Sequence, residues 1–442
     1  MKTINIGICG LGTVGAGVVN VMQRNASALT GRSGCHFQLK HIGARRDNDN
    51  CDVSQYQVSR DIFAVVNDPD IDIVVELIGG YEPALELVLR AIENGKHVVT
   101  ANKALIAVHG NEIFAAAETK GVNVYFEAAV AGGIPIIKAL REGLAANSIQ
   151  WLAGIINGTG NYILTEMRDK GREFDDVLRD AQALGYAEAD PTFDVEGIDA
   201  AHKLVILASL AFGIPLNFDA CVTEGISGIA PQDVVFAGEL GYRIKHLGIA
   251  RKTDQGVELR VHPTLIPQRR LIANVDGVMN AVLVNGDAVG ATLYYGAGAG
   301  AEPTASAVVA DIVDAARRIA SPGGAAVPHL GFNAESLQAL PIVDINAIEA
   351  AYYLRITAED KPGVLSHITQ ILSESGISIE AVLQKEPAQH GEALVAGASV
   401  QVPIVLITDI TTESRFKAAV KGIEALDSIQ DKVNFIRVES LG

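Results

Sequence analysis

The residues that could do chemistry are concentrated between positions 185 and 204, where five carboxylates and one lysine precede a nearly all-apolar segment. Asp199 and Lys203 are four residues apart, so on a helix they would share one face with Glu196. We expect this helix to begin at Asp194, because aspartate is a good N-cap and Glu196 adds a favourable charge to the first turn. The pattern predicts a carboxylate beside an ammonium group at the start of a helix.

Two interpretations of the Asp199–Lys203 pair are open. On an exposed helix it would be an ordinary ion pair that contributes about 0.2–0.5 kcal/mol. The segment Leu204–Phe212 is apolar on all sides, however, which predicts a buried helix. A lysine entering such a helix is costly unless it is paired or functional, and burial lowers its pKa while a carboxylate raises it. Such a group can take the hydroxyl proton when an alcohol loses hydride to a nicotinamide, and nearby carboxylates could hold a cationic substrate amine.

The start of the chain has the pattern of a dinucleotide site. The apolar run Ile4–Cys9 precedes a helical pattern, and between them lies the turn Gly10-Leu11-Gly12-Thr13-Val14-Gly15. Gly10 would permit the sharp turn, Gly12 the approach of backbone amides to a pyrophosphate, and Gly15 the close packing of helix and strand. Glycine-rich turns also arise for purely steric reasons, but this placement favours nucleotide binding at the helix N-terminus.

Further apolar runs alternate with helical stretches through the first third of the chain. We expect strands over 37–44, 71–78, 97–100 and 122–126, and helices over 83–94 and 111–120. This alternation predicts an α/β fold with a Rossmann-type doubly wound parallel sheet, whose ligands bind at the carboxyl edge of the strands. Thr100 and Lys103 lie at that edge and are expected beside the nicotinamide, although Lys103 could instead be a solvated loop residue.

The end of the second expected strand bears on the choice of cofactor. It reads Gly43-Ala44-Arg45-Arg46, where an NAD-specific protein places a carboxylate for the ribose 2′-hydroxyl. Arginine can instead accept a 2′-phosphate, so Arg45 favours NADP over NAD. Asp47 follows directly, and Arg45 could also stack on the adenine or cap a loop, so NAD stays the alternative.

The pattern changes at the glycine-rich segment 127–135, and we place a domain boundary near Pro135. Carbonyl oxygens beside Glu127 would suit a hard cation, although a hinge explains the same residues. A second glycine-rich stretch, 296–300, could approach the cofactor or return the chain to the first domain. The expected domains are a dinucleotide-binding domain over 1–134, to which a helix over 304–319 returns, and an α+β catalytic and dimerisation domain over 135–303.

The last hundred residues form a new unit. We expect strands over 352–358, 377–385, 402–408 and 433–438, and helices over 363–375 and 412–426. The order βαββαβ predicts a ferredoxin-like domain over residues 350–442.

These segments resemble known families. Residues 185–204 resemble the signature of homoserine dehydrogenases, and the segment 156–164 resembles another block of that family. With the segments 10–15 and 100–103, the likeness covers roughly the first three-quarters of the chain. The turn 360–365 resembles the ligand turn of ACT domains, which bind amino acids and pair side by side.

The resemblance implies an enzyme that interconverts L-homoserine and L-aspartate 4-semialdehyde with NAD(P), in threonine and methionine biosynthesis. It implies that Lys203 is the acid/base residue and that Glu188 and Asp199 bind the amino acid. It further implies substrate contacts from Tyr186, Asp194, Gly158 and Thr159. The cofactor contacts that it implies are Leu11, Thr13, Val14, Arg45, Lys103, Gly185 and Gly300. It also implies a monovalent cation site, usually sodium, at Glu127, Val130, Gly132 and Ile134. Because two lysines could converge on one substrate oxygen, we hypothesise that Lys203 transfers the proton and Lys103 orients substrate and cofactor.

The ACT resemblance implies feedback control by threonine, and a domain that only mediates oligomerisation is the alternative. We expect a homodimer or homotetramer. No kinase-like region precedes residue 1, so we expect a monofunctional enzyme.

Composition argues against other classes of protein. The chain has 442 residues, 49% of them hydrophobic, which indicates two or three domains. Its formal net charge of -17 opposes binding to nucleic acid or anionic lipid. Four isolated cysteines indicate neither a disulfide framework nor a zinc site. No apolar run is long enough to cross a bilayer, and no secretory signal is present, so we expect a soluble cytoplasmic protein with small-molecule partners.

Two rival functions are weighed against this one. A redox or amino-acid sensor could combine the same domains without turnover, but it would not explain the cluster of Glu188, Asp199 and Lys203 before a buried helix. Another ACT-bearing dehydrogenase, acting on 2-hydroxy acids, would typically use a histidine–carboxylate couple, and the sequence offers no convincing one.

Overall fold

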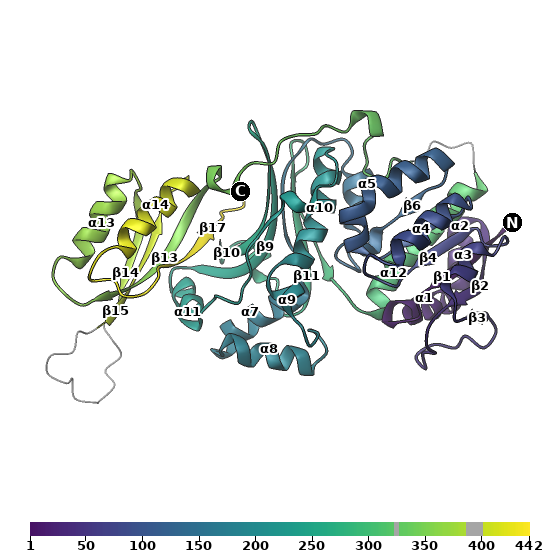
Figure 1. The fold of residues 1–442 in the computed structure, drawn as a ribbon, viewed down its shortest axis with the longest axis horizontal. Helices are drawn as coiled ribbons and strands as arrows, with labels where there is room; N and C mark the ends of the chain where they lie inside the picture. Colours follow the sequence, from purple (N-terminus) through teal and green to yellow (C-terminus); the bar gives the residue numbers. More distant parts are fainter. Residues whose placement is uncertain (322–326, 386–400) are drawn as a thin grey trace.

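The computed structural model describes residues 1–321, 327–385 and 401–442. Three units follow one another along the long axis of the molecule (Figure 1). The N-terminal unit lies at one end and the C-terminal unit at the other, with the middle of the chain between them.

The N-terminal unit is built on a six-stranded sheet with the order β3-β2-β1-β4-β5-β6, in which every neighbouring pair is parallel. Ile4, Ile6 and Ile8 of the central strand are fully buried, because helices cover both faces of the sheet. The predicted Rossmann-type sheet is confirmed. Its strands are β1 (Lys2–Cys9), β2 (Cys35–Gly43), β3 (Gln57–Ser59), β4 (Ile73–Glu76), β5 (His97–Thr100) and β6 (Val124–Tyr125).

Two sets of helices cover this sheet. One face carries α1 (Thr13–Arg24) and α12 (Ala301–Ala320), and the other carries α3 (Ile62–Asn67), α4 (Ala84–Glu93) and α5 (Lys103–Lys120). The short helix α2 (Ala26–Ser33) contacts β2 and α12. A Cβ atom at Gly17 would lie 2.4 Å from the carbonyl oxygen of Ala301, so α12 packs against α1 although nearly 300 residues separate them.

The middle unit is a mainly antiparallel sheet with helices packed on it, in which only the short β8 pairs in parallel among the described strands of this unit. The strand order is β12-β11-β7-β9-β10, and β8 pairs with β10. The strands are β7 (Ile149–Ile155), β8 (Val222–Thr223), β9 (Tyr242–Thr253), β10 (Gly256–Pro267), β11 (Met279–Gly286) and β12 (Gly290–Ala297). The helices are α6 (Ile136–Lys138), α7 (Gly158–Lys170), α8 (Phe174–Ala183), α9 (Thr192–Val195), α10 (Ile198–Phe212) and α11 (Pro231–Glu239). Short 3-10 or π turns complete it: η1 (Glu127–Ala129), η2 (Ala139–Gly143), η3 (Phe218–Ala220) and η4 (Leu271–Asn274).

The C-terminal unit has the predicted βαββαβ order. Its sheet order, β17-β13-β15-β14, is that of a ferredoxin-like domain, and α13 and α14 pack against one face. The elements are β13 (Glu349–Glu359), α13 (Val364–Glu374), β14 (Ile379–Gln384), β15 (Gln401–Thr408), β16 (Thr411–Thr412), α14 (Glu413–Glu424) and β17 (Asn434–Val438), preceded by η5 (Ala334–Ser336) and η6 (Ile345–Ala347).

The middle and C-terminal units share one continuous sheet, which the sequence did not predict. Strand β17 pairs in parallel with β10 through Thr264–Arg437 and Leu265–Val438. The C-terminal unit is therefore joined to the middle unit by backbone hydrogen bonds as well as by side chains.

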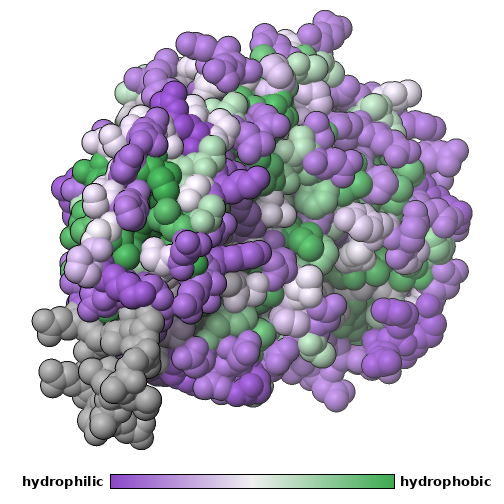
Figure 2. All heavy atoms as spheres, turned by 60° about the vertical axis from the view of Figure 1, so that its left-hand side comes forward, coloured by the Kyte–Doolittle hydropathy of each residue, from purple (hydrophilic) through white to green (hydrophobic). Residues whose placement is uncertain are grey.

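No helix in the described ranges is long and apolar enough to cross a membrane. The face of the molecule in Figure 2 is covered mainly by hydrophilic residues, with hydrophobic residues in smaller groups between them.

Candidate active site

The glycine turn opens onto the carboxyl edge of the first sheet. Gly10 has a φ of 106°, and a Cβ there would lie 2.6 Å from the carbonyl oxygen of Leu77. A Cβ at Gly15 would lie 2.3 Å from the Gly10 carbonyl oxygen, so both positions require glycine for steric reasons. Gly12, the N-cap of α1, faces open space instead, as a backbone approached by a ligand would. Leu11 is buried, whereas Thr13 is exposed and Val14 half-buried.

Arg45 lies exposed just beyond β2 and forms no ion pair with the described residues. The neighbouring carboxylate of Asp47 is held by Arg60 at 2.8 Å, and Arg60 also donates to the carbonyl oxygen of Ala44. Asn48, which the sequence analysis missed, donates to the Leu11 carbonyl oxygen at 2.9 Å. Asn48 therefore ties the end of β2 to the glycine turn, while Arg45 stays accessible.

Lys103 is the first residue of α5, not a loop residue. The helix expected over 111–120 begins eight residues earlier, because the Asn102 side chain accepts a hydrogen bond from the Leu105 amide and caps it. The Asn102 side chain also donates to the Gly80 carbonyl oxygen at 2.6 Å, which fixes the start of α5 against the loop after β4.

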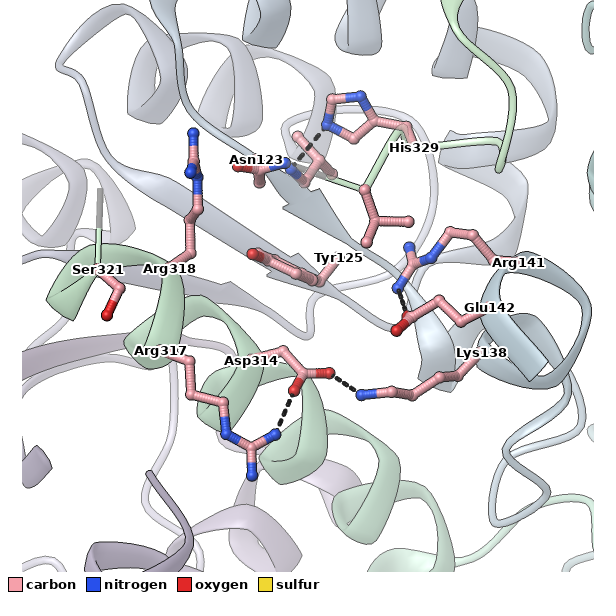
Figure 3. Close-up of a pocket in the computed structure, with 12 residues that line it drawn as sticks. Asn123, Tyr125, Lys138, Arg141, Glu142, Asp314, Arg317, Arg318, Ser321 and His329 are labelled. Atoms are coloured by element: carbon pink, nitrogen blue, oxygen red, sulfur yellow. Dashed lines mark hydrogen bonds and ion pairs between the residues drawn. The ribbon is translucent and has the colours of Figure 1, made fainter. Parts of the chain in front are cut away.

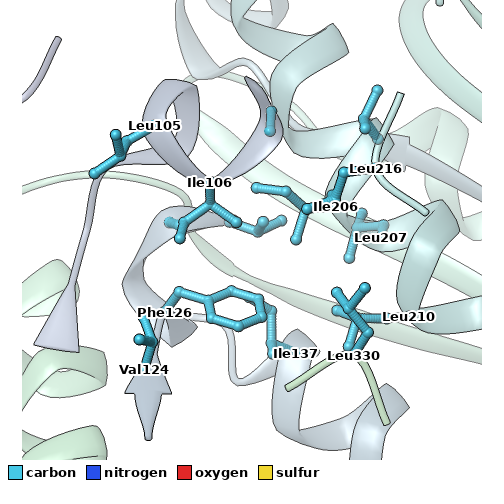
Figure 4. Packing of buried hydrophobic residues seen from close by; sticks show 14 of the residues in the cluster. Leu105, Ile106, Val124, Phe126, Ile137, Ile206, Leu207, Leu210, Leu216 and Leu330 are labelled. Carbon is cyan, nitrogen blue, oxygen red and sulfur yellow. The ribbon is translucent and has the colours of Figure 1, made fainter. Parts of the chain in front are cut away.

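Helices α5 and α10 pack together across the boundary between the first two units. Ile106 of α5 and Ile206 of α10 belong to one apolar core, where they lie beside each other in Figure 4, with Phe126 and Leu210 nearby. Because both helices are held by this core, the side chains at their N-terminal ends are brought to one place.

At that place two ammonium groups share one carboxylate. Lys203 Nζ lies 2.6 Å from Asp199 Oδ2, and Lys103 Nζ lies 2.8 Å from Asp199 Oδ1. Lys203 also donates to the Ile156 carbonyl oxygen at 2.7 Å. The Lys203 side chain is 12% exposed and that of Lys103 37%, so Lys103 is the more accessible of the two amines.

The Asn157 side chain joins two carboxylates to this cluster. Its Nδ2 donates to Asp194 Oδ1 at 2.8 Å and to Asp199 Oδ2 at 2.9 Å. Its Oδ1 accepts from the Gly160 amide at 2.7 Å and so caps α7. One side chain thus fixes a helix and bridges the two acidic residues.

The two lysines differ in their electrostatics. Burial lowers the pKa of Lys203 and outweighs the attraction of Asp199. Asp199 raises the pKa of Lys103, and this attraction outweighs burial. Burial opposes ionisation of Asp199, but the two ammonium groups hold its pKa below the usual value, whereas burial raises the pKa of Asp194. The arrangement combines an amine that loses its proton readily with one that stays charged.

The predicted helix start at Asp194 is wrong. Asp194 lies inside the short helix α9, and α10 begins at Ile198 with Gly197 as its N-cap. Gly197 has a φ of 84°, which breaks the helical path between the two segments. Asp194 therefore bonds to Asn157 instead of capping α10. Glu196 accepts from the Ser227 hydroxyl at 2.8 Å rather than extending the face of Asp199 and Lys203.

Other residues expected to contact substrate flank the cluster. The Thr159 hydroxyl donates to the Tyr186 carbonyl oxygen at 2.6 Å, and the Tyr186 ring makes an edge contact with Tyr162. Glu188 is exposed, and its charge contributes to the raised pKa of Lys103. A Cβ at Gly158 would lie 2.7 Å from the Val278 carbonyl oxygen, whereas Gly185, with a φ of 74°, faces open space.

Thr100 is buried and its hydroxyl donates to Glu76 Oε2 at 2.5 Å. Glu76, at the end of β4, also accepts from the Ile78 amide at 2.7 Å. The sequence analysis missed Glu76, although a carboxylate inside an apolar strand run was a visible signal. The pair shapes the loop at the carboxyl edge of the sheet.

The residue beside Lys203, His202, was also missed. Its ring is fully buried and stacks on Phe218 at 4.2 Å and on Phe193 at 5.4 Å. Burial lowers its pKa to about 4, so the ring is neutral at pH 7. The Tyr81 hydroxyl lies 3.3 Å from its Nε2. His202 thus packs between aromatic rings next to Lys203 and the lysine–aspartate cluster.

The segment expected to bind a cation forms a tight turn. Glu127 is buried, and its two oxygens accept from the Ile137 and Lys138 amides at 2.9 and 2.8 Å. The carbonyl oxygens of Val130 and Gly132 accept no hydrogen bond from the described residues, whereas that of Ile134 accepts from the Ile136 amide.

The two glycine-rich stretches pack against each other. The Gly133 amide donates to the Ala297 carbonyl oxygen at 2.9 Å, and a Cβ at Gly132 would lie 2.4 Å from the Gly298 carbonyl oxygen. Gly300, with a φ of 121°, is the N-cap of α12. The stretch 296–300 therefore returns the chain to the first unit along a fixed path.

The chain is similar to known proteins over its full length. Family models described as homoserine dehydrogenase, as its NAD-binding domain and as the ACT domain match residues 135–313, 10–127 and 352–427. A homoserine dehydrogenase of Pseudomonas aeruginosa is 63% identical over 441 residues, which cover 100% of both chains. The crystal structure of a homoserine dehydrogenase from Thiobacillus denitrificans has a TM-score of 0.93 at 60% identity, over 100% of this chain and 99% of that one. A hyperthermophilic archaeal homoserine dehydrogenase in complex with NADPH has a TM-score of 0.60 at 26% identity, over 71% of this chain and 98% of that one.

Proposed function

This chain belongs to the homoserine dehydrogenase family, and from that premise we propose how its residues interconvert L-homoserine and L-aspartate 4-semialdehyde. The observation that carries the proposal is the shared carboxylate of Asp199, with Lys203 and Lys103 on its two oxygens. The pKa values of these lysines are shifted in opposite directions, as acid/base and positioning roles require.

Lys203 acts as the acid/base residue. A bound nicotinamide supplies the hydride acceptor for the alcohol carbon. As the carbon–hydrogen bond breaks, the neutral amine of Lys203 takes the hydroxyl proton, and in the reverse direction the ammonium returns it to the carbonyl oxygen. Asp199 and the Ile156 carbonyl oxygen hold the amine in place throughout. Lys103 stays cationic and orients the substrate oxygen and the cofactor.

The substrate amino group is held by carboxylates. Glu188 and Asp199 are the proposed partners, with Asp194 nearby and Tyr186, Gly158 and Thr159 lining the site. The exposed position of Glu188 supports this role, because its carboxylate is open to a ligand while its charge reaches Lys103.

NADP is the proposed cofactor and NAD the alternative. Arg45 is exposed at the end of β2, while Arg60 engages Asp47, the nearest carboxylate in sequence. An arginine without a competing carboxylate suits a 2′-phosphate. The pyrophosphate would lie at the open face of Gly12, between Gly10 and Gly15, with contacts from Leu11, Thr13, Val14, Thr100, Gly185 and Gly300.

A monovalent cation, sodium by preference, would be held by Glu127 and the carbonyl oxygens of Val130, Gly132 and Ile134. The residues fit such an ion. Glu127 lies close enough to the buried Asp311 that burial and its negative charge hold the pKa of Asp311 well above the usual value. A cation beside two buried carboxyl groups would relieve that repulsion and stabilise the turn that follows Glu127.

The ACT domain gives the enzyme its proposed feedback control by threonine, in a homodimer or homotetramer that works in threonine and methionine biosynthesis. The turn 360–363 is exposed beside the N-terminus of α13, and Gly363 caps that helix with a φ of 94°. All four cysteines are unpaired, which suits a reducing cytoplasm.

Replacing each lysine tests the division of roles. We expect Lys203→Met to lower kcat for homoserine oxidation about 100- to 10,000-fold, because the proton acceptor is lost. Lys103→Met should raise KM about tenfold and lower kcat less, because a positioning charge is lost. Initial rates of NADP and NAD reduction with homoserine measure both effects, with exposed Lys170→Met as the matched control. If Lys203→Met kept its turnover while Lys103→Met abolished it, the two roles would have to be exchanged.

A further inference from the structure

A cavity of about 320 Å³ lies beside β6, the edge strand of the first sheet, away from the candidate active site. Figure 3 shows it between the C-terminal half of α12 and the segment formed by α6 and η2. Strands β4 and β5 separate β6 from β1, so three strand spacings, about 14 Å, lie between this cavity and the glycine turn. The cavity shares no lining residue with the cluster around Lys103, Asp199 and Lys203.

The lining of this cavity is positively charged. Four cations face two carboxylates, and burial lowers the pKa of the neighbouring His329 to about 4, so that it adds no charge. The chain as a whole carries a formal charge of -17. A cationic recess in an acidic molecule concentrates the field and attracts anions. The charged residues are Lys138, Arg141, Arg317, Arg318, Glu142 and Asp314.

Arg141 is the residue whose hydrogen bonding is incomplete. Its side chain is 6% exposed, and its Nε is buried without an acceptor among the described residues. Its ion pair with the adjacent Glu142 is 3.3 Å long. By contrast, Arg317 pairs with Asp314 at 2.9 Å and also donates to the Arg32 carbonyl oxygen. Arg141 lines the cavity, and the described residues satisfy its guanidinium only in part.

Tyr125 adds a second donor. Its ring crosses the cavity in Figure 3, with its hydroxyl toward α12 and the guanidinium of Arg141 beyond the opposite end of the ring. A phenol hydroxyl carries its proton at neutral pH and can donate it to an anion. The donors come from β6, from η2 and from α12, which are three separate elements.

We propose that this cavity is a binding site for the carboxylate or phosphoryl group of a small metabolite, with Arg141 and Tyr125 as its principal donors. A planar guanidinium matches the oxygens of both groups in a paired geometry, which makes it the anchor. The bound group would bridge α12 to the segment that follows the Glu127 turn, where the Lys138 amide already donates to Glu127.

Calorimetric titration of the full chain tests the site. The protein is first saturated with NADPH, so that the anion site of the glycine turn is filled, and is then titrated separately with inorganic phosphate and with succinate. We expect one equivalent of at least one of these anions to bind. Arg141→Gln should weaken that binding at least about tenfold and Tyr125→Phe about threefold, because each loses a donor. Arg179→Gln, at an exposed arginine paired with Asp176, should bind as the unaltered protein does.

The outcomes separate the possible ligands and the failure of the proposal. Binding of phosphate alone assigns the site to phosphoryl groups, and binding of succinate alone assigns it to carboxylates. The proposal is overturned if neither anion binds at concentrations up to about 20 mM, or if Arg141→Gln binds as tightly as the unaltered protein. If circular dichroism shows that Arg141→Gln does not fold, Tyr125→Phe decides, since it removes one hydroxyl and keeps the ring.

Discussion

At the scale of the residue, the site depends on one carboxylate that serves two amines. The spacing of Asp199 and Lys203 predicted their pairing from the sequence, because four residues on a helix place two side chains on one face. The contact between Lys103 and Asp199 could not be predicted, since nearly 100 residues separate them. Asn157 was equally hidden, because an asparagine before a helix usually signals only a cap.

Asp199 also sets the pH at which the base works. In the proposed mechanism homoserine oxidation needs the neutral form of Lys203, so the rate should rise with pH through the pKa of that lysine. The charge of Asp199 raises this pKa, so removing it in Asp199→Asn should lower the pKa further. We expect the rising limb of kcat/KM to move about one unit to lower pH, while the maximal rate falls about 10- to 100-fold because the amines lose their shared partner. Profiles of kcat/KM against pH measure both effects.

The exposed Asp175→Asn, in the first turn of α8, is the control for the loss of a negative charge and should leave the profile unchanged. A limb that stayed in place in Asp199→Asn, or moved to higher pH, would contradict the assignment of Lys203 as the group that titrates.

At the scale of the element, the type of each helix and strand was easier to predict than its ends. The Rossmann strands follow from apolar runs between turn signals, and the order βαββαβ from alternating patterns. The predicted start of α10 was wrong because Asp194 has every local property of an N-cap. The left-handed backbone at Gly197 separates α9 from α10, and a Cβ there would contact Val261 and His246, which the local sequence does not reveal.

Replacing Gly197 tests this break. A Cβ there would lie 3.0 Å from Val261 Cγ1 and 3.2 Å from His246 Cε1, and its φ of 84° disfavours any side chain. We expect Gly197→Ala to lower the free energy of unfolding by about 2–4 kcal/mol, the sum of backbone strain and overpacking. It should also lower kcat, because Asp199 follows two residues later. Urea denaturation and initial rates measure the two effects.

Gly171→Ala is the matched control. Gly171 is the C-cap of α7 with a φ of 62°, and no atom lies within 4 Å of a Cβ placed there. Its replacement should cost only about 1–2 kcal/mol of backbone strain and leave kcat unaltered. Equal losses of stability in the two variants would show that packing against Val261 and His246 does not matter.

At the scale of the whole molecule, the C-terminal unit is tied to the middle unit at the shared sheet. Arg437 of β17 is 1% exposed and pairs with Glu413 of α14 and, at 2.7 Å, with Glu224 of the middle unit. Breaking a buried pair by removing one partner is strongly destabilising. Such a contact between distant segments leaves no local pattern in the sequence, which predicted only a separate unit at the C-terminus.

The Arg437–Glu224 ion pair is connected to the active site by one short segment, residues 224–226. The Glu224 carbonyl oxygen accepts from the His246 ring at 3.0 Å, and the Ile226 amide donates to the Val195 carbonyl oxygen at 2.9 Å. A Cβ at Gly225 would lie 2.2 Å from Glu196 Oε2. The segment 224–226 therefore packs directly against the turn that precedes Asp199. A displacement of β17 would shift this segment and, through it, the position of Asp199.

Glu224→Gln should weaken the proposed response to threonine without preventing threonine binding. The variant keeps the Arg437–Glu413 pair but loses the charge that links Arg437 to the segment 224–226. We expect the threonine concentration that halves the rate to rise about fivefold, which corresponds to a coupling loss of about 1 kcal/mol. Calorimetry should give an affinity for threonine close to that of the unaltered protein.

Glu239→Gln is the control, because it breaks the exposed Lys385–Glu239 pair between the same units, which is worth less than about 1 kcal/mol. Glu224→Gln, Glu239→Gln and the unaltered protein could instead respond equally to threonine. That result would exclude the Arg437–Glu224 contact as the route between effector and active site.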